Sequence, residues 1–104
     1  MQYDEHSDGS EIKVALNDEF EVALPETRTA GYRWITTENG EPILKLMSEA
    51  TMPNAGAVGG SGRRVWNFRA VSEGDTKLKL EYRRPWEKSA EPTRTFTLKI
   101  HVGS

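Results

Sequence analysis

The stretch Phe96-Thr97-Leu98-Lys99-Ile100-His101-Val102 alternates apolar and polar residues without interruption. This period-2 alternation places every second side chain on the same face of an extended chain, so it predicts a β-strand with one buried face. Outward from this stretch, six others have similar strand character: residues 12–17, 20–24, 32–36, 43–47, 65–70 and 77–82. The sequence therefore predicts seven short strands.

These strands indicate the fold class. No segment shows the i, i+3, i+4 apolar spacing of an amphipathic helix. Seven short strands in 104 residues are typical of two packed sheets, and we expect an all-β, immunoglobulin-like β-sandwich of about seven antiparallel strands. The chain has no cysteine, so it has no inter-sheet disulfide. We expect Trp34, Trp66 and Phe68 to fill the space that such a disulfide would take.

The N-terminal residues, MQYDEHSDGS, are polar. We interpret residues 1–10 as a flexible N-terminal arm and residues 11–104 as a single domain. Asp4, Glu5, His6 and Asp8 have metal-binding side chains, but in such a tail we interpret them as solvated and predict neither a metal site nor a cofactor. The segment has no basic n-region and no apolar h-region, so no signal peptide is predicted. A cytoplasmic location, and a periplasmic or secreted one after removal of a leader, remain alternatives.

Charge and composition argue against several functional classes. The 14 Lys and Arg residues are balanced by 16 Asp and Glu residues, whereas a nucleic-acid binder needs a clearly basic face. No apolar run approaches the roughly 20 residues of a membrane-spanning helix. The absence of cysteine excludes a cysteine nucleophile and thiolate metal sites. His6 and His101 lie beside no candidate nucleophile, so we predict that the chain is not an enzyme.

The connections between the predicted strands are of two kinds. Residues 17–19, 38–41 and 72–75 are short and rich in Asn, Asp and Gly, as tight turns are. The second kind is longer and irregular, and comprises residues 25–31, 48–62 and 83–92. If consecutive strands run up and down, the three irregular connections share one end of the sandwich. Irregular loops grouped on a rigid scaffold are typical of a binding module.

Each irregular connection has features suited to contact with another protein. In the first, residues 27–31 read Thr-Arg-Thr-Ala-Gly and are small except for Arg28. Gly31 can adopt backbone angles that other residues resist. The second holds four of the nine glycines: Gly56, Gly59, Gly60 and Gly62. It lacks the Gly-Lys-Ser/Thr of a phosphate-binding loop. In the third, Pro85 restricts the turn, and Trp86 lies outside the apolar alternation and is expected to be an exposed anchor.

These loops resemble those of the chagasin family of cysteine peptidase inhibitors, which carry Asn-Pro-Thr-Thr-Gly, Gly-x-Gly-Gly and Arg-Pro-Trp motifs. The resemblance runs from about Ile12 to Val102 and is strongest at residues 80–87, where Arg84-Pro85-Trp86 is intact. Leu24-Pro25, Gly31, Tyr32 and Trp34 also match. Of the first motif, residues 27–31 keep only Thr29 and Gly31, with Arg28 in place of the proline and Ala30 in place of the second threonine. In the glycine motif, Ser61 stands at the third position.

The resemblance implies a reversible, noncovalent inhibitor whose three loops occlude the active-site cleft of a papain-like cysteine peptidase. The implied peptidase-binding residues are Thr27, Arg28, Thr29, Ala30, Gly31, Gly59, Gly60, Ser61, Gly62, Arg84, Pro85 and Trp86. Residues 27–31 would approach the catalytic Cys/His centre as a wedge, Trp86 would pack along one wall of the cleft, and residues 59–62 would lie against the other side. We expect the free protein to be a monomer that binds neither nucleic acid nor membrane. The alternative is an immunoglobulin-like adhesion or protein-binding module that uses the same loop end.

Overall fold

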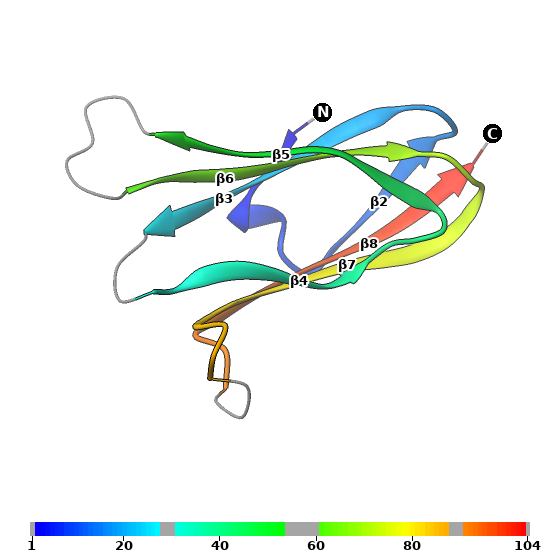
Figure 1. The fold of residues 1–104 in the computed structure, drawn as a ribbon. Coiled ribbons are helices and arrows are strands. Elements are labelled where there is room, and N and C mark those ends of the chain that lie inside the picture. Colours follow the sequence, from blue (N-terminus) through cyan, green and yellow to red (C-terminus); the bar gives the residue numbers. More distant parts are fainter. Residues whose placement is uncertain (1, 28–30, 54–60, 88–90, 104) are drawn as a thin grey trace.

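The computed structural model describes residues 2–27, 31–53, 61–87 and 91–103. The elements in this part of the chain are β1 (Gln2–Tyr3), a 3-10 helix η1 (Glu5–Ser7), β2 (Ser10–Ala15), β3 (Glu19–Thr27), β4 (Arg33–Asn39), β5 (Leu44–Pro53), β6 (Ser61–Ala70), β7 (Gly74–Arg83) and β8 (Arg94–Gly103). They form two four-stranded sheets, with strand orders β1-β3-β6-β5 and β2-β8-β7-β4, which face each other (Figure 1). The predicted all-β, immunoglobulin-like sandwich is confirmed. None of the described segments forms a helix long and apolar enough to span a membrane.

Two strand pairs are parallel, which corrects the expectation of an antiparallel arrangement throughout. β1 runs parallel to β3, and β2 runs parallel to β8, whereas the other four pairs are antiparallel. The turn after β2 explains the second case because it crosses between the sheets instead of closing a hairpin. The Leu16 N–H donates to the Gly103 carbonyl in one sheet, and the Asn17 N–H donates to the Ala70 carbonyl in the other. Asn17 makes this crossing with a φ of 76°.

The core lies between the two sheets and is built from the inward positions of the alternating strands. Its largest fully buried side chains include Trp66, Phe20, Phe68 and Phe96. Trp34, Trp66 and Phe68 all belong to this core, with 9%, 1% and 2% of their surface exposed, as predicted. The rings of Phe20 and Phe68 stack with their centroids 5.6 Å apart. Phe20 and Phe68 are paired on neighbouring strands of one sheet, and buried side chains of both sheets form one continuous core where a disulfide is absent.

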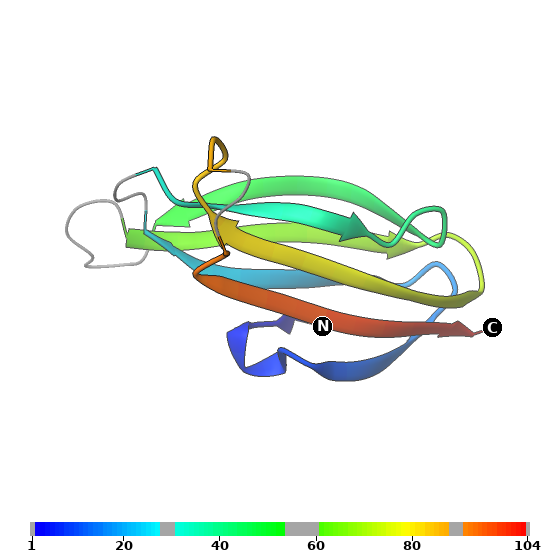
Figure 2. The same ribbon diagram turned by 90° about the horizontal axis from the view of Figure 1, so that it is seen from below.

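Residues 2–10, expected to form an arm outside the domain, lie against the sandwich. β1 extends one sheet and β2 extends the other, and Figure 2 shows this dark-blue segment beside β8. The Tyr3 ring packs edge-on against Phe20, with 6.0 Å between the centroids. Asp8 Oδ1 accepts a hydrogen bond of 2.8 Å from the Thr97 N–H. The sequence did not indicate this arrangement because a two-residue strand is too short to show an alternation.

The acidic side chains of this segment have structural partners. Asp4, Glu5 and His6 bring their potential ligand atoms within 4.8 Å of one another. Asp4 Oδ1, however, caps η1 by accepting from the His6 N–H at 2.9 Å. Glu5 Oε1 lies 3.3 Å from Nη2 of Arg63, whose positive charge disfavours a cation there. The Glu5–Arg63 ion pair therefore ties η1 to β6.

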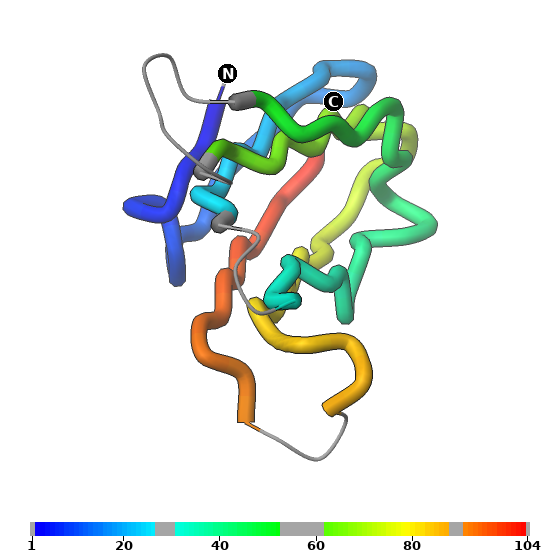
Figure 3. Tube along the Cα trace, turned by 60° about the vertical axis from the view of Figure 1, so that its left-hand side comes forward, coloured from blue at the N-terminus to red at the C-terminus, as the bar shows by residue number. Residues whose placement is uncertain are grey.

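The plain turns and the irregular connections lie at opposite ends of the sandwich. In Figure 1 the turns after β2, β4 and β6 are on the right, and the strand ends that flank the other three connections are on the left. Strand register agrees, since Thr27 pairs with Ser61, Pro53 with Gly62, and Arg33 with Arg83. We call this second end the loop end; Figure 3 turns it toward the reader.

The described residues of the connection predicted over 48–62, which are 48–53 and 61–62, belong to strands. β5 continues to Pro53, with Ser48 opposite Asn67 and Met52 opposite Arg63, and β6 begins at Ser61. β5 is the edge strand of its sheet, and its residues 45–52 are exposed whichever face they lie on. A strand exposed on both faces has no apolar alternation, so the sequence pattern predicted a loop there.

Candidate functional site

Residues 84–87 form a tight turn that projects Trp86 from the loop end. The Glu87 N–H donates to the Arg84 carbonyl at 3.1 Å. Pro85 stands at the second position of this turn, where its fixed φ fits the required backbone angles. The Trp86 side chain is 67% exposed, which confirms the prediction that it lies outside the core. The turn thus presents a large apolar surface from a restricted backbone.

Two arginines hold the residue that follows this tryptophan. Arg84 Nη1 lies 2.7 Å from Oε1 of Glu87, and Arg83 donates to the Glu87 backbone carbonyl. Arg83 also pairs with Glu81 at 3.1 Å. The hydrogen bond to Glu87 raises the pKa of Arg84 above its ordinary value. An arginine is charged at neutral pH in any case, so the ion pair with Glu87 is always available. These contacts brace the turn on the C-terminal side of Trp86.

Trp86 lies directly against Gly31, which is the last residue of the first irregular connection. Gly31 has a φ of 81°, in the left-handed region that favours glycine. A Cβ atom at this position would lie 2.3 Å from Cη2 and 3.0 Å from Cζ3 of Trp86. The indole therefore occupies space that any side chain at residue 31 would need. The first and third connections meet at this contact.

A stack of side chains leads from the turn toward the core. The Arg84 guanidinium carbon lies 4.8 Å from the centroid of the Tyr32 ring. Tyr32 stacks on Tyr82 with 5.7 Å between centroids, and Tyr82 packs on Trp34 at 5.1 Å. Since Trp34 is part of the core, the position of Arg84 is tied to the rigid part of the sandwich.

In the other sheet, a polar cluster joins β5 to β6. Glu49 Oε1 lies 3.2 Å from Arg64 Nη2 and accepts a 2.7 Å hydrogen bond from Trp66 Nε1. Arg64 also donates to the Thr51 hydroxyl at 2.8 Å. These contacts join β5 and β6 through side chains from the middle of each strand toward the loop end.

The structure describes seven of the twelve residues predicted to bind a peptidase: Thr27, Gly31, Ser61, Gly62, Arg84, Pro85 and Trp86. Gly31 and Trp86 are in contact, and Arg84 stands beside them. Thr27 and Ser61 face each other across the end of the β3–β6 pair, and Gly62 is buried next to them. Arg28, Thr29, Ala30, Gly59 and Gly60 lie outside the described residues.

Three residues of this end were not among the predicted peptidase-binding residues: Glu26, Tyr32 and Glu87. Glu26 is only 5% exposed and lines a cavity of about 160 Å³ with Arg33 and Arg64. The alternation Phe20, Val22, Leu24 already pointed its side chain inward. The sequence also indicated the pairing of Glu87 with Arg84, because Glu87 stands three residues after Arg84 across a turn that contains proline.

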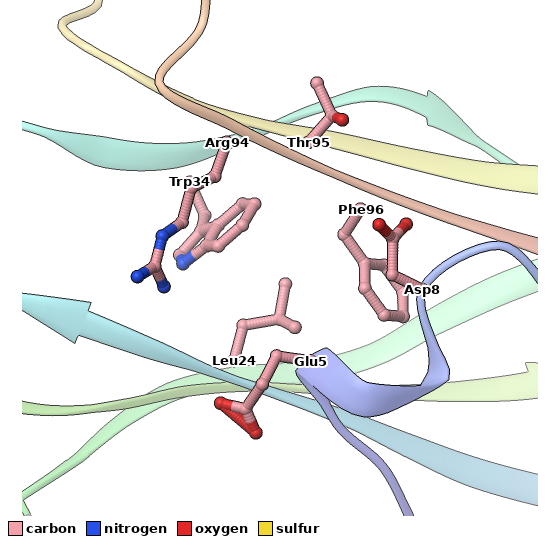
Figure 4. A pocket seen from close by; sticks show the side chains of 7 residues that line it. All are labelled: Glu5, Asp8, Leu24, Trp34, Arg94, Thr95 and Phe96. Atoms are coloured by element: carbon pink, nitrogen blue, oxygen red, sulfur yellow. The ribbon is translucent and has the colours of Figure 1, made fainter.

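A larger cavity, of about 500 Å³, opens beside the N-terminal segment (Figure 4). Leu24, Trp34 and Phe96 form its inner wall, and its rim carries polar residues from η1, the following turn and β8. Leu24 and Phe96 are 0% and 1% exposed, so they add almost no accessible apolar surface. Polar and apolar atoms contribute about equally to its lining, so the cavity is an open notch between strand ends and not the predominantly apolar pocket typical of small-molecule sites.

Comparison with known proteins agrees with the fold and identifies the family. A family model described as Chagasin family peptidase inhibitor I42 matches residues 13–100. Amoebiasin-1 of Entamoeba histolytica is 30% identical over 104 residues, covering 98% of this chain and 99% of the relative. The crystal structure of EhICP2, a cysteine protease inhibitor from Entamoeba histolytica, matches with a TM-score of 0.89 and 26% identity, covering 98% of this chain and 94% of that one.

A more distant structure shares the fold. PbICP-C, solved in complex with falcipain-2, matches with a TM-score of 0.62 and 15% identity, covering 99% of this chain and 90% of that one. At this identity the likeness concerns the sandwich alone. The family assignment rests on the model match over residues 13–100 and on the full-length similarity to Amoebiasin-1. This chain belongs to the chagasin family of peptidase inhibitors.

Proposed function

We propose that this protein inhibits papain-like cysteine peptidases reversibly and noncovalently, by inserting its loop end into the active-site cleft. Membership of the chagasin family makes it a cysteine peptidase inhibitor. EhICP2 is a cysteine protease inhibitor, and PbICP-C was solved bound to falcipain-2, which supports a peptidase as the partner. The observation that carries the proposal is Trp86, which is 67% exposed and held against Gly31 at the loop end.

An exposed tryptophan on a restricted turn is suited to anchor an interface. Tryptophan is among the residues most enriched in binding hot spots. Fixing a side chain before association reduces the conformational entropy that binding costs. Occlusion makes and breaks no covalent bond, so the inhibitor needs only shape and surface to exclude substrate from the cleft.

Ten of the twelve predicted residues have distinct places in this proposal. Residues 27–31 enter the cleft as a wedge near the catalytic Cys/His centre, Trp86 packs along one wall, and residues 59–62 lie against the other side. Strand register supports this arrangement, because Thr27 pairs with Ser61 at the end of β3, and Arg84 directly follows the pair Arg33–Arg83 at the end of β7. Glycines there leave room for main chain to approach an enzyme surface closely.

The substitution Trp86→Ala tests the anchor. We expect it to cost about 2 kcal/mol of binding free energy, which is roughly a 30-fold increase in the inhibition constant for a papain-like peptidase. The free energy of unfolding changes little because the indole is mostly exposed. Val71→Ala is the matched control: Val71 is 41% exposed and follows β6 at the opposite end, so inhibition is unchanged.

Two results contradict the proposal. An unchanged inhibition constant for Trp86→Ala removes the anchor role of Trp86. If the wild-type protein inhibits none of several papain-like peptidases at about 1 μM, a concentration that detects even moderate affinity, the inhibitor function itself fails. The loop end would then be better explained as an immunoglobulin-like protein-binding surface.

A further inference from the structure

We propose that Arg84 is a positioning residue, which fastens the turn of residues 84–87 to Tyr32 and so holds Trp86 over Gly31 before a peptidase arrives. The inference rests on the proposed function and deepens it. It assigns to the first residue of the Arg-Pro-Trp motif a role within the inhibitor rather than a contact with the enzyme.

The guanidinium of Arg84 joins two parts of the molecule. One of its nitrogens lies 2.7 Å from the carboxylate of Glu87, on the same turn. Its central carbon lies 4.8 Å from the ring centroid of Tyr32, close to the start of β4. A planar, delocalised cation can stack on a ring and pair with a carboxylate at the same time, which the compact ammonium of lysine does less well.

The contact acts on the N-terminal side of Trp86, whereas the hydrogen bond from Arg83 to the Glu87 carbonyl holds the C-terminal side. The base of the connection is closed by the hydrogen bond from the Thr93 N–H to the Tyr82 carbonyl, at 2.9 Å. Trp86 lies beyond this base and is mostly exposed, so closure at the base does not by itself fix the indole. Tyr32 is itself immobilised by stacking on Tyr82. The contact between Arg84 and Tyr32 therefore restricts movement of the turn relative to the sheet.

Positioning and direct contact with the enzyme make different predictions. If Arg84 acts by holding Trp86, then substituting Arg84 has little effect on the inhibition constant once the indole is absent. If Arg84 instead touches the peptidase, its effect persists when Trp86 is absent. A double-mutant cycle separates the two cases.

The first experiment compares inhibition constants for the wild type, Arg84→Met, Trp86→Ala and the double variant. Methionine keeps an unbranched apolar chain and removes the charge and the planar head. We expect Arg84→Met to weaken inhibition about tenfold in the wild-type background and less than about twofold in the Trp86→Ala background. Arg84→Lys weakens it by an intermediate amount. Tyr32→Leu behaves like Arg84→Met, whereas Tyr32→Phe retains most of the affinity because it keeps the ring.

The second experiment uses the free protein. Nitrogen-15 relaxation of the Trp86 indole N–H reports its motion without a peptidase, and we expect Arg84→Met and Tyr32→Leu to increase that motion. The Trp34 and Trp66 indoles serve as internal controls because they are 9% and 1% exposed. This readout distinguishes failure of the inference from failure of the inhibitor function, since it requires no target enzyme.

Three outcomes overturn the inference. Equal effects of Arg84→Met in the two backgrounds show direct contact with the enzyme. An unchanged inhibition constant for Arg84→Met shows that the residue has no part in binding. Unaltered relaxation of the Trp86 indole shows that Arg84 does not hold it. Increased indole motion together with strong coupling between positions 84 and 86 supports the inference.

Discussion

The substitution Gly31→Ala adds one methyl group at the contact between the two connections. A Cβ there would lie 2.3 Å from Cη2 of Trp86, whereas carbon atoms in ordinary contact are about 3.5 Å apart. The indole must therefore move by more than about 1 Å to make room. The added side chain also strains the backbone, because residue 31 has a φ of 81°. That strain costs about 1–2 kcal/mol in the left-handed region.

Gly9→Ala is a matched control. Gly9 has a φ of 79°, nearly that of Gly31, but nothing lies within 4 Å of the position that its Cβ would take. Both variants therefore carry the same backbone strain, and we expect each to lower the free energy of unfolding by about 1–2 kcal/mol. Only Gly31→Ala displaces Trp86. If the anchor is lost in full, the inhibition constant rises by about 30-fold, equivalent to about 2 kcal/mol.

The assay pairs inhibition of a papain-like peptidase with urea unfolding of both variants. We expect similar unfolding midpoints and a large difference in inhibition. The reasoning is refuted if Gly31→Ala inhibits as well as Gly9→Ala, because the indole would then tolerate displacement without loss of binding. It is also refuted if both variants lose inhibition equally, because backbone strain alone would then account for the effect.

Two further substitutions test the scaffold and should leave inhibition intact. Tyr3→Ala removes the ring that packs edge-on against Phe20 at 6.0 Å, and we expect it to lower the free energy of unfolding by about 2 kcal/mol; unchanged stability in urea would mean that residues 2–10 do not contribute to the fold. Phe68→Ala empties a position that is 2% exposed, and we expect a loss of about 3–5 kcal/mol; calorimetry showing a loss below about 1 kcal/mol would contradict the assignment of this ring to the core.

The central strands could be predicted from the sequence because one of their faces is buried. Phe96, Leu98 and Ile100 are each 1% exposed or less and alternate with residues on the outer face. β5 was only partly predicted, since an edge strand with exposed side chains on both faces has no such pattern. The parallel pairing of β2 with β8 was missed because alternation describes a strand's faces and says nothing about its neighbour.

The candidate site divides in a similar way. The exposure of Trp86 followed from its place outside the alternation, and the grouping of the irregular connections followed from strand direction. The contact between Trp86 and Gly31 could not be predicted from the sequence, because it joins residues from two loops more than 50 positions apart. The stack of Arg84, Tyr32 and Tyr82 also depends on strand register, which brings β4 beside β7.

The most direct test of the inhibitor function is the inhibition profile of the wild-type protein against papain-like, caspase-like and serine peptidases. We predict reversible inhibition of papain-like enzymes at or below about 1 μM. We predict no inhibition of the other two classes at the same concentration. Inhibition of serine peptidases with equal strength, or of no papain-like enzyme, would contradict the conclusion that this loop end is built for a papain-like cleft.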